Sequence, residues 1–201
     1  MTSSDQLRIT IYDGAHLSRE VVLDALHRLR VILGNAKVVS NPVLGNADDP
    51  EASLFMYADM PSSGDEPGIG CRARRDIAVK IVESSPKSLP KTVLGMSSPY
   101  AESGLNIRVF NDHISEAALG HDLPYTIVLS YAMAHEIGHV LLKNGKHSHC
   151  GIMSSIWTGL EYEQMARSGL VFSGDEVKIM SANLRVPVCQ KPDRGPIAAD
   201  R

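Results

Sequence analysis

Two histidines four residues apart, with a glutamate directly after the first, are the residues of this chain best suited to catalytic chemistry. His135, Glu136 and His139 spell HExxH inside a long apolar segment. On an α-helix, residues i and i+4 project from one face, so both imidazoles can bind a single Zn²⁺ ion. Glu136 would lie beside that ion and could take a proton from a water molecule held there. The motif predicts metal-assisted hydrolysis; the simpler interpretation is a pair of hydrogen-bonded histidines on a core helix.

The segment that carries the motif has the features of a buried helix. Pro124 suits the first turn, because its missing N–H would have no partner there. Residues 125–144 are apolar on nearly every side, which is typical of a helix in the centre of a core. Two histidines and a glutamate would be costly in lipid, so we do not expect this segment to span a membrane. Lys143 and Gly145 predict the end of the helix, with Gly145 in the left-handed conformation.

A catalytic zinc ion usually has three protein ligands and one open position, so a third ligand must follow the helix. His147 comes two residues after Gly145, where the chain has turned and can point back at the helix. His149 is a second candidate. Glu161 or Glu163 is the acidic alternative, because one class of HExxH enzymes takes its third ligand from a glutamate further along the chain.

The stretch from residue 134 to residue 157 resembles the metzincin metallopeptidases. An HEIGH sequence, a turn containing glycine, a third histidine followed by serine, and a later methionine are similar to the HExxHxxGxxH helix and Met turn of that family. The resemblance implies that His135, His139 and His147 bind one catalytic Zn²⁺ and that Glu136 is the general base. It also implies that Met153 forms the floor beneath the site.

The spacing departs from the metzincin pattern at three positions. Leu142 stands where the family has a glycine, Gly145 stands where the third histidine would be, and His147 follows two residues later. A helix about half a turn longer would accommodate this delay. The string from His135 to Trp157 also resembles short, mostly uncharacterised bacterial proteins with HEIGHLLL, then HS, GIM and a tryptophan. In that group a strand, a helix and a strand precede the zinc helix.

Hydrophobic periodicity outlines the elements that must position the site. Alternating apolar residues predict strands around 7–11, 77–81 and 105–109, with a shorter candidate over Lys37–Ser40. A helix capped by Ser18 runs to a stop at Gly34 and Asn35. Residues 41–70 read as a long loop with one possible short strand. A short helix over 155–167 and a terminal helix with a Ser173–Glu176 capping box complete the pattern. The order predicts an α+β fold with helices packed on a twisted mixed sheet, and the resemblance implies that this fold is metzincin-like.

The resemblance also suggests where a substrate would bind. In metzincins an edge strand near the metal pairs with the extended peptide, and strand addition is a general way to hold a peptide backbone. Residues 93–97 could be that strand, with Leu94, Gly95 and Met96 contacting substrate; a plain connecting segment is the simpler interpretation. Tyr162 could stabilise an oxyanion, although a core or surface position is favoured. His113 and His121 are isolated in polar loop contexts and receive no role.

Composition bounds the remaining possibilities. With 201 residues, 43% hydrophobic and 21% charged, we expect one catalytic domain over 1–186 and a loose tail over 187–201. A net charge of −3 favours no nucleic-acid partner, and we expect no transmembrane segment. Without a signal peptide, the chain would be cytoplasmic if Met1 is the native start, and secreted if it is a processed form.

The cysteines leave the redox state open. Cys71, Cys150 and Cys189 have no CxxC spacing, so one disulfide with a free thiol would fit secretion, and three thiols would fit the cytosol. Cys150 could bind metal, but a small buried side chain is the simpler interpretation.

The sequence favours a zinc metalloendopeptidase acting on peptide or protein substrates, with Glu136 as general base. One alternative is a zinc-stabilised binding domain that cleaves nothing; a fourth protein ligand would support it, because structural zinc sites are closed. Another is a hydrolase that uses the same residues on a non-peptide amide or ester.

Overall fold

The computed structural model describes residues 7–45, 76–99 and 106–185. Within these residues, five strands form one sheet in the order β2-β1-β3-β5-β4. The strands are β1 (Leu7–Gly14), β2 (Ser40–Leu44), β3 (Asp76–Val82), β4 (Gly95–Ser97) and β5 (Asn106–Phe110). All pairings are parallel except that of β4 with β5, which is antiparallel. The predicted mixed sheet is confirmed, and β4 forms one of its two edges.

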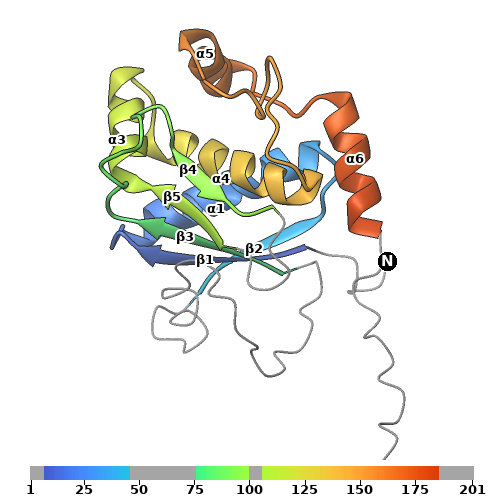
Figure 1. The fold of residues 1–201 in the computed structure, drawn as a ribbon. Coiled ribbons are helices and arrows are strands. Elements are labelled where there is room, and N and C mark those ends of the chain that lie inside the picture. The colour runs from blue at the N-terminus through green and yellow to red at the C-terminus, as the bar shows by residue number, and fades with distance from the viewer. Residues whose placement is uncertain (1–6, 46–75, 100–105, 186–201) are drawn as a thin grey trace, which may run out of the picture.

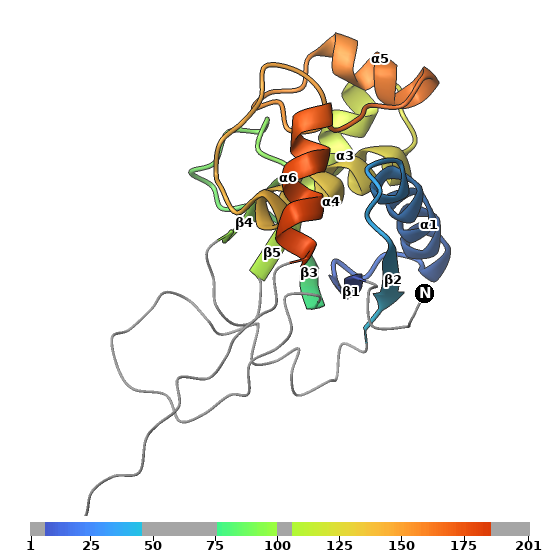
Figure 2. The ribbon, with the colours of Figure 1, turned by 90° about the vertical axis from the view of Figure 1, so that its right-hand side faces the viewer.

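Five helices accompany the sheet in the described part of the chain, and three of them lie on one of its faces. They are α1 (Arg19–Asn35), α3 (Asn111–Gly120), α4 (Tyr125–Leu142), α5 (Gly159–Arg167) and α6 (Gly174–Arg185). α1, α3 and α4 lie on the same face of the sheet, and α5 lies farthest from it (Figures 1 and 2). α4 contacts α1, α3, α5 and α6 as well as β4 and β5, so it is the central helix of the α+β fold.

The alternating pattern of the strands explains how the sheet and helices share one core. Leu7, Ile9 and Ile11 of β1 are all buried, while Arg8 between them is exposed. Successive side chains of a strand point to opposite faces, so the apolar set of β1 faces the helices. Ile77, Val79 and Ile81 repeat the pattern in β3, in register with β1. These strand predictions are confirmed.

The helix predicted after Ser18 is confirmed, whereas the strand that follows it begins later than expected. The Ser18 side chain accepts a hydrogen bond from the Val21 N–H and caps α1, which ends at Asn35. Lys37 then takes a left-handed conformation, with φ of 61°, and β2 begins only at Ser40. The candidate strand over Lys37–Ser40 is therefore wrong except for its last residue. β2 contains Pro42, which an edge strand tolerates because its outer N–H needs no partner.

Helix α3 is absent from the sequence-based outline. It starts directly after β5, and no side-chain hydrogen bond caps its N-terminus. Only Ile114 and Ala118 form an apolar i, i+4 pair, so the periodicity is weak. His113 lies on this helix and is buried, which corrects its placement in a polar loop.

The C-terminal helices agree in part with the predictions. α5 begins at Gly159, four residues later than the predicted start at 155, because Thr158 caps it and Glu161 closes a capping box. Trp157 therefore precedes the helix. In α6, the Ser173 N–H donates to Glu176 Oε2 (2.7 Å) and the Glu176 N–H donates to Ser173 Oγ (3.3 Å), so the second capping box is confirmed.

Several predictions fall outside the described residues. They include most of the loop over 41–70, Leu105, Cys71, Cys189 and the tail over 187–201. Among the described helices, none is long and apolar enough to cross a membrane.

Candidate metal centre and active site

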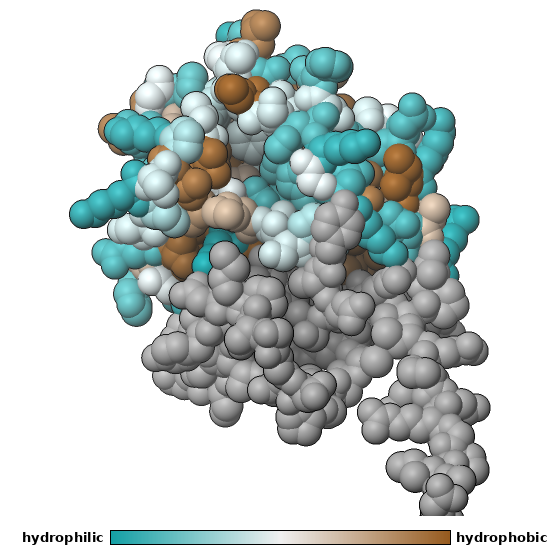
Figure 3. All heavy atoms as spheres, viewed as in Figure 1, coloured by the Kyte–Doolittle hydropathy of each residue, from teal (hydrophilic) through white to brown (hydrophobic). Residues whose placement is uncertain are grey.

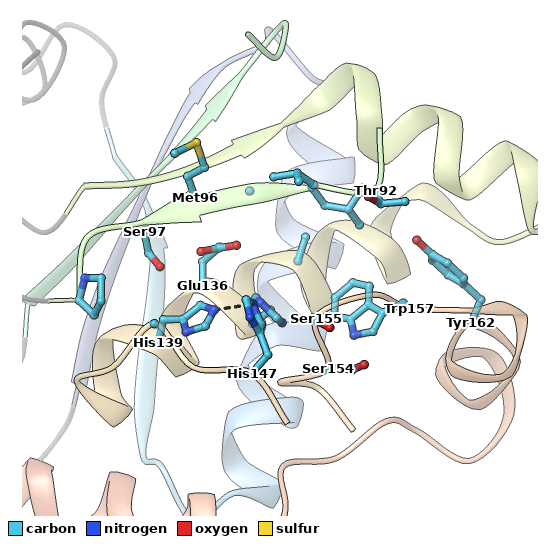
Figure 4. Close-up of a pocket in the computed structure, with 17 residues that line it drawn as sticks. Thr92, Met96, Ser97, Glu136, His139, His147, Ser154, Ser155, Trp157 and Tyr162 are labelled. Carbon is cyan, nitrogen blue, oxygen red and sulfur yellow. Dashed lines mark hydrogen bonds between the residues drawn. The ribbon is translucent and has the colours of Figure 1, made fainter. Parts of the chain in front are cut away.

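Three imidazoles converge where α4 ends and the chain turns back. His135 and His139 come from successive turns of α4, and His147 comes from the loop that follows. Their nitrogen atoms lie within 4.8 Å of one another, and no other group of three His, Cys, Asp or Glu side chains in the described residues could hold a metal ion. The Nε2 atoms of His135 and His139 are 3.1 Å apart. His139 and His147 point into a common cleft (Figure 4).

Backbone carbonyls orient the two helix histidines. His135 Nδ1 lies 2.7 Å from the Ile152 carbonyl oxygen, and His139 Nδ1 lies 3.0 Å from that of Asn144. A carbonyl oxygen only accepts, so each Nδ1 carries the hydrogen and each Nε2 exposes a lone pair. Two lone pairs that face each other at 3.1 Å repel unless a cation binds both. Three nitrogen donors in this arrangement fit a zinc ion.

The two helix histidines have the protonation state that metal binding requires. Burial, helped by the neighbouring His139 and His147, lowers the pKa of His135 to about 4, against the hydrogen bond to Ile152. Burial also lowers the pKa of His139. Neutral imidazole is the metal-binding form, so at neutral pH these side chains need lose no proton before they bind an ion.

Glu136 faces the edge of the sheet. Its side chain is 6% exposed, and its carboxylate lies between β4 and the His139–His147 pair (Figure 4). Burial raises the pKa of Glu136 to about 7, while a hydrogen bond from the Ser97 hydroxyl acts in the opposite direction. A Cβ atom at Gly95 would lie 2.9 Å from Glu136 Cγ and 2.9 Å from the Arg108 carbonyl oxygen. Glycine at this position lets β4 lie directly against Glu136.

Met153 packs against α4. It is buried, and a Cβ atom at Gly138 would lie 2.5 Å from its Sδ atom. The glycine of HEIGH therefore gives Met153 room against α4. The preceding residue, Ile152, supplies the carbonyl that holds His135. The Met153 segment thus contacts the histidine helix through both a side chain and a backbone atom.

The three imidazoles and the Glu136 carboxylate line one cleft with a volume of about 310 Å³. The predicted substrate-contacting residues Leu94, Gly95 and Met96 form its β4 side. Hydrophobic side chains gather around β4 on the face seen in the space-filling view (Figure 3). The remaining lining residues come from the segment before β4, the chain around Ser97, α4 and the turn after it, and the region of α5: Thr92, Val93, Ser97, Pro99, Ala132, His135, Glu136, His139, Gly145, His147, Ser154, Ser155, Trp157 and Tyr162.

The alternative third ligands do not join the histidine pair. His149 is exposed and lies outside the group of three. Glu161 Oε2 accepts hydrogen bonds from the Thr158 N–H (2.7 Å) and hydroxyl (2.6 Å), so its carboxylate serves the cap of α5. Glu163 forms an exposed ion pair with Arg167. Cys150 is a free, exposed thiol, which corrects the expectation of a buried side chain.

The turn after α4 also differs from its prediction. The helix ends at Leu142, and Lys143 rather than Gly145 takes the left-handed conformation, with φ of 53°. The two residues that delay His147 therefore lie in the turn, and the helix is not extended by half a turn. Asn144 gains a role in this turn, since its carbonyl oxygen holds His139.

Sequence reasoning anticipated the aromatic end of the cleft only in part, since it considered a place for Tyr162 in the site but favoured a core or surface position. The Trp157 ring meets His135 edge-on at 5.7 Å between ring centroids, and its Nε1–H donates to the Ile152 carbonyl oxygen (3.3 Å). Tyr162 is buried and stacks on His121 at 3.8 Å. The sequence marked Trp157 only as part of a resemblance, and it contained no signal for the contact of Ser97 with Glu136.

The fold defined by this sheet and helix arrangement is that of zinc-dependent peptidases of known structure. A zinc-dependent peptidase from Methanocorpusculum labreanum matches with a TM-score of 0.51 and 14% sequence identity, over 86% of this chain and 99% of that one. Archaemetzincin from Methanopyrus kandleri matches with a TM-score of 0.51 and 14% identity, over 92% of this chain and 99% of that one. No protein-family model and no curated protein matches the sequence.

Proposed function

We propose that this protein is a zinc-dependent endopeptidase of the metzincin type. The observation that carries the proposal is that the Nε2 atoms of His135 and His139 lie 3.1 Å apart with their lone pairs facing each other. Backbone carbonyls bound at Nδ1 set the orientation of both rings. His135, His139 and His147 would hold one Zn²⁺ ion, and Glu136 would be the general base. The shared fold with two zinc-dependent peptidases supports this assignment.

The residues around the cleft supply the steps of peptide hydrolysis. A bound zinc ion would polarise the scissile carbonyl and lower the pKa of water at the site. Glu136 would accept a proton from the attacking water and deliver it to the leaving nitrogen. The Glu136 carboxylate lies beside the three imidazoles, in the cleft where both transfers would take place. The Ser97 hydroxyl and the space at Gly95 would hold the carboxylate in place for them.

The edge strand provides a way to hold an extended peptide. Among the residues that the structure describes, β4 pairs with β5 on one side only, because it is the last strand of their sheet. An extended substrate could add to its free side through main-chain hydrogen bonds, beside Leu94, Gly95 and Met96. Glu136 is the sole carboxylate among the described residues that line the cleft, and Lys and Arg are absent from this lining. This lining favours an uncharged, apolar residue next to the cleaved bond.

The lack of a fourth ligand argues for catalysis over a purely structural zinc site. Structural zinc ions are usually closed by four protein ligands, whereas catalytic ones keep a position open. In the described part of the chain, the candidate group contains three histidines and no fourth side chain. Glu136 lies beside this group without belonging to it, as a general base would.

The test is zinc content by elemental mass spectrometry together with cleavage of a peptide library. Wild type should retain about one zinc per chain, and His147→Ala should retain much less than His149→Ala. Glu136→Ala should keep the zinc and lose about a hundredfold or more in kcat. A zinc-free wild-type protein, or full activity in Glu136→Ala, would overturn the proposal.

A further inference from the structure

The loop that carries His147 is held by few regular backbone bonds. Between α4 and α5 it contains a single isolated bridge, between Ser148 and Ser154, and the Ser148 N–H donates to the Met153 carbonyl oxygen (2.8 Å). This loop presents His147 and also supplies the Ile152 carbonyl that orients His135. Its conformation therefore affects two of the three imidazoles.

His147 lacks the support that the other two histidines have. His135 and His139 are each held by a backbone carbonyl at Nδ1. His147 is exposed, and within the described residues its ring makes contacts with the other two rings but no hydrogen bond. The backbone on either side must therefore set the position of this imidazole.

The adjacent residue is tied to a distant helix. The Ser148 hydroxyl donates a short hydrogen bond to Glu176 Oε1 in α6, 28 residues along the chain. Glu176 is 6% exposed, and its other oxygen accepts from the Ser173 N–H (2.7 Å). A buried carboxylate is costly unless its oxygens are satisfied, so this geometry is strongly specified. Glu176 thus closes the cap of α6 with one oxygen and holds the loop with the other.

We infer that Glu176 is a positioning residue for the metal site: through Ser148 it fixes the backbone that presents His147. This inference rests on the proposed zinc function. α6 packs on α4, the helix that carries the other two histidines, so the hydrogen bond sets the loop relative to that helix. Residues that orient metal ligands typically change metal affinity by about ten- to a hundredfold when they are removed.

The test measures zinc affinity by chelator competition on the full-length protein. Ser148→Ala and Glu176→Ala should each weaken zinc binding by about tenfold or more. Ser148→Thr keeps the hydroxyl and should restore most of the affinity. The visible absorption of Co²⁺ bound in place of Zn²⁺ reports the coordination of the ion. Its bands should be weaker in Ser148→Ala than in wild type, and close to the wild-type intensity in Ser148→Thr.

Two control variants separate positioning from folding. Ser173→Ala removes the side-chain cap of α6 but leaves the hydrogen bond between Ser148 and Glu176, so it should keep wild-type zinc affinity. Asp175→Ala changes an exposed neighbour that pairs with Lys178, and it should also bind normally. All variants are compared at a temperature where circular dichroism shows them folded.

The outcomes distinguish this inference from the proposed function. Wild-type affinity in both Ser148→Ala and Glu176→Ala, in a protein that binds zinc and cleaves peptides, would overturn the role of Glu176 alone. A loss of zinc affinity in Ser173→Ala as large as that in Ser148→Ala would also overturn it, because the effect would then come from the stability of α6. A wild-type protein that binds no zinc would instead overturn the proposed function.

Discussion

At the scale of single residues, the site depends on two glycines as much as on the residues with functional side chains. Gly138 lets Met153 pack closely against α4, and Gly95 lets β4 pack closely against Glu136. A Cβ atom at Gly138 would meet Met153, and one at Gly95 would meet Glu136. The first glycine is part of the motif and the second is 43 positions earlier, on a different element. Close packing on both sides of α4 thus sets where the carboxylate and the imidazoles can lie.

Gly95→Ala should impair catalysis without removing the metal. The new methyl group would lie 2.9 Å from Glu136 Cγ and from the Arg108 carbonyl oxygen, so either the carboxylate or β4 must shift. Forced overpacking of this kind costs about 1–3 kcal/mol. We expect kcat to fall by at least tenfold while zinc content stays at the wild-type level. The assay is steady-state peptide cleavage alongside elemental analysis.

The matched control is Gly34→Ala on α1. A Cβ atom at Gly34 meets nothing within 4 Å, and alanine is the better helix former by about 1 kcal/mol. This variant should keep wild-type activity and unfold at an equal or higher temperature. Unchanged activity in Gly95→Ala would show that the carboxylate does not depend on the space at position 95.

At the scale of elements, a partly buried polar cluster holds the segment that leads into β4. His113 on α3 contacts the Val93 carbonyl oxygen through Nδ1 (2.8 Å) and the Ser85 hydroxyl through Nε2 (2.7 Å). Asp112 accepts hydrogen bonds from the Ser85 N–H and hydroxyl, each at 3.0 Å. Val93 lines the cleft, so α3 controls the approach of β4 to α4.

Ser85→Ala should destabilise the fold in a pH-dependent way. Burial acts to raise the pKa of Asp112, but the hydrogen bonds from Ser85 and His113 outweigh it and hold this pKa below its ordinary value. A lowered carboxyl pKa stabilises the fold above the unfolded-state pKa, and this stabilisation is lost as the pH falls through the folded-state pKa. The variant should lose about 1 kcal/mol at pH 7 and progressively less below about pH 4.

Urea unfolding of wild type and Ser85→Ala at pH 7 and pH 3 measures this difference. Ser115→Ala is the control. Ser115 lies on α3, as Asp112 does, but its hydroxyl makes a long hydrogen bond to Asn111 (3.4 Å) and none to Asp112 among the described contacts. A stability difference that stays constant between the two pH values would contradict the role of Asp112.

The helices and strands that the sequence predicted are specified by local patterns, whereas the missed helix α3 is held by contacts with residues distant in the sequence. β1 and α1 carry strong local periodicity, α4 carries a long apolar run with the HExxH motif, and α6 carries its own capping box, so each was predictable. α3 is short and polar, and its main hydrogen bonds, made by Asp112 and His113, are to residues 20 to 28 positions away. Local pattern cannot reveal such contacts, because they exist only after the sheet has formed.

The same distinction applies within the candidate site. His135, Glu136 and His139 were evident because a helix sets their geometry. The turn after Leu142 was predicted with the wrong residue in the left-handed conformation, since Gly145 is the usual choice and Lys143 is not. The contacts of Ser97 with Glu136, of Trp157 with His135 and of Glu176 with Ser148 could not be found, because each forms only through tertiary packing.

At the scale of the whole molecule, the proposed metal site joins the central helix to the C-terminal part of the chain. α4 packs on the sheet and α1, while His147, Ile152 and Met153 belong to the loop that leads toward α5 and α6. Within this loop, Ile152 and Met153 contact α4 through one hydrogen bond and close packing at Gly138. An ion bound by residues of both parts would add a third connection.

Removing zinc should therefore lower the thermal stability of the whole domain. An ion that binds the folded state alone stabilises it by RT ln(1 + [L]/Kd), which is about 2.7 kcal/mol when free zinc exceeds Kd a hundredfold. We expect the unfolding midpoint to fall by several degrees on chelation and to recover when zinc is returned. His147→Ala should respond much less to zinc, because it would keep only the two helix ligands. Calorimetry of wild type and variant, with and without zinc, measures both effects. An unfolding midpoint of wild type that is independent of zinc would show that the three imidazoles form no metal site in the folded protein.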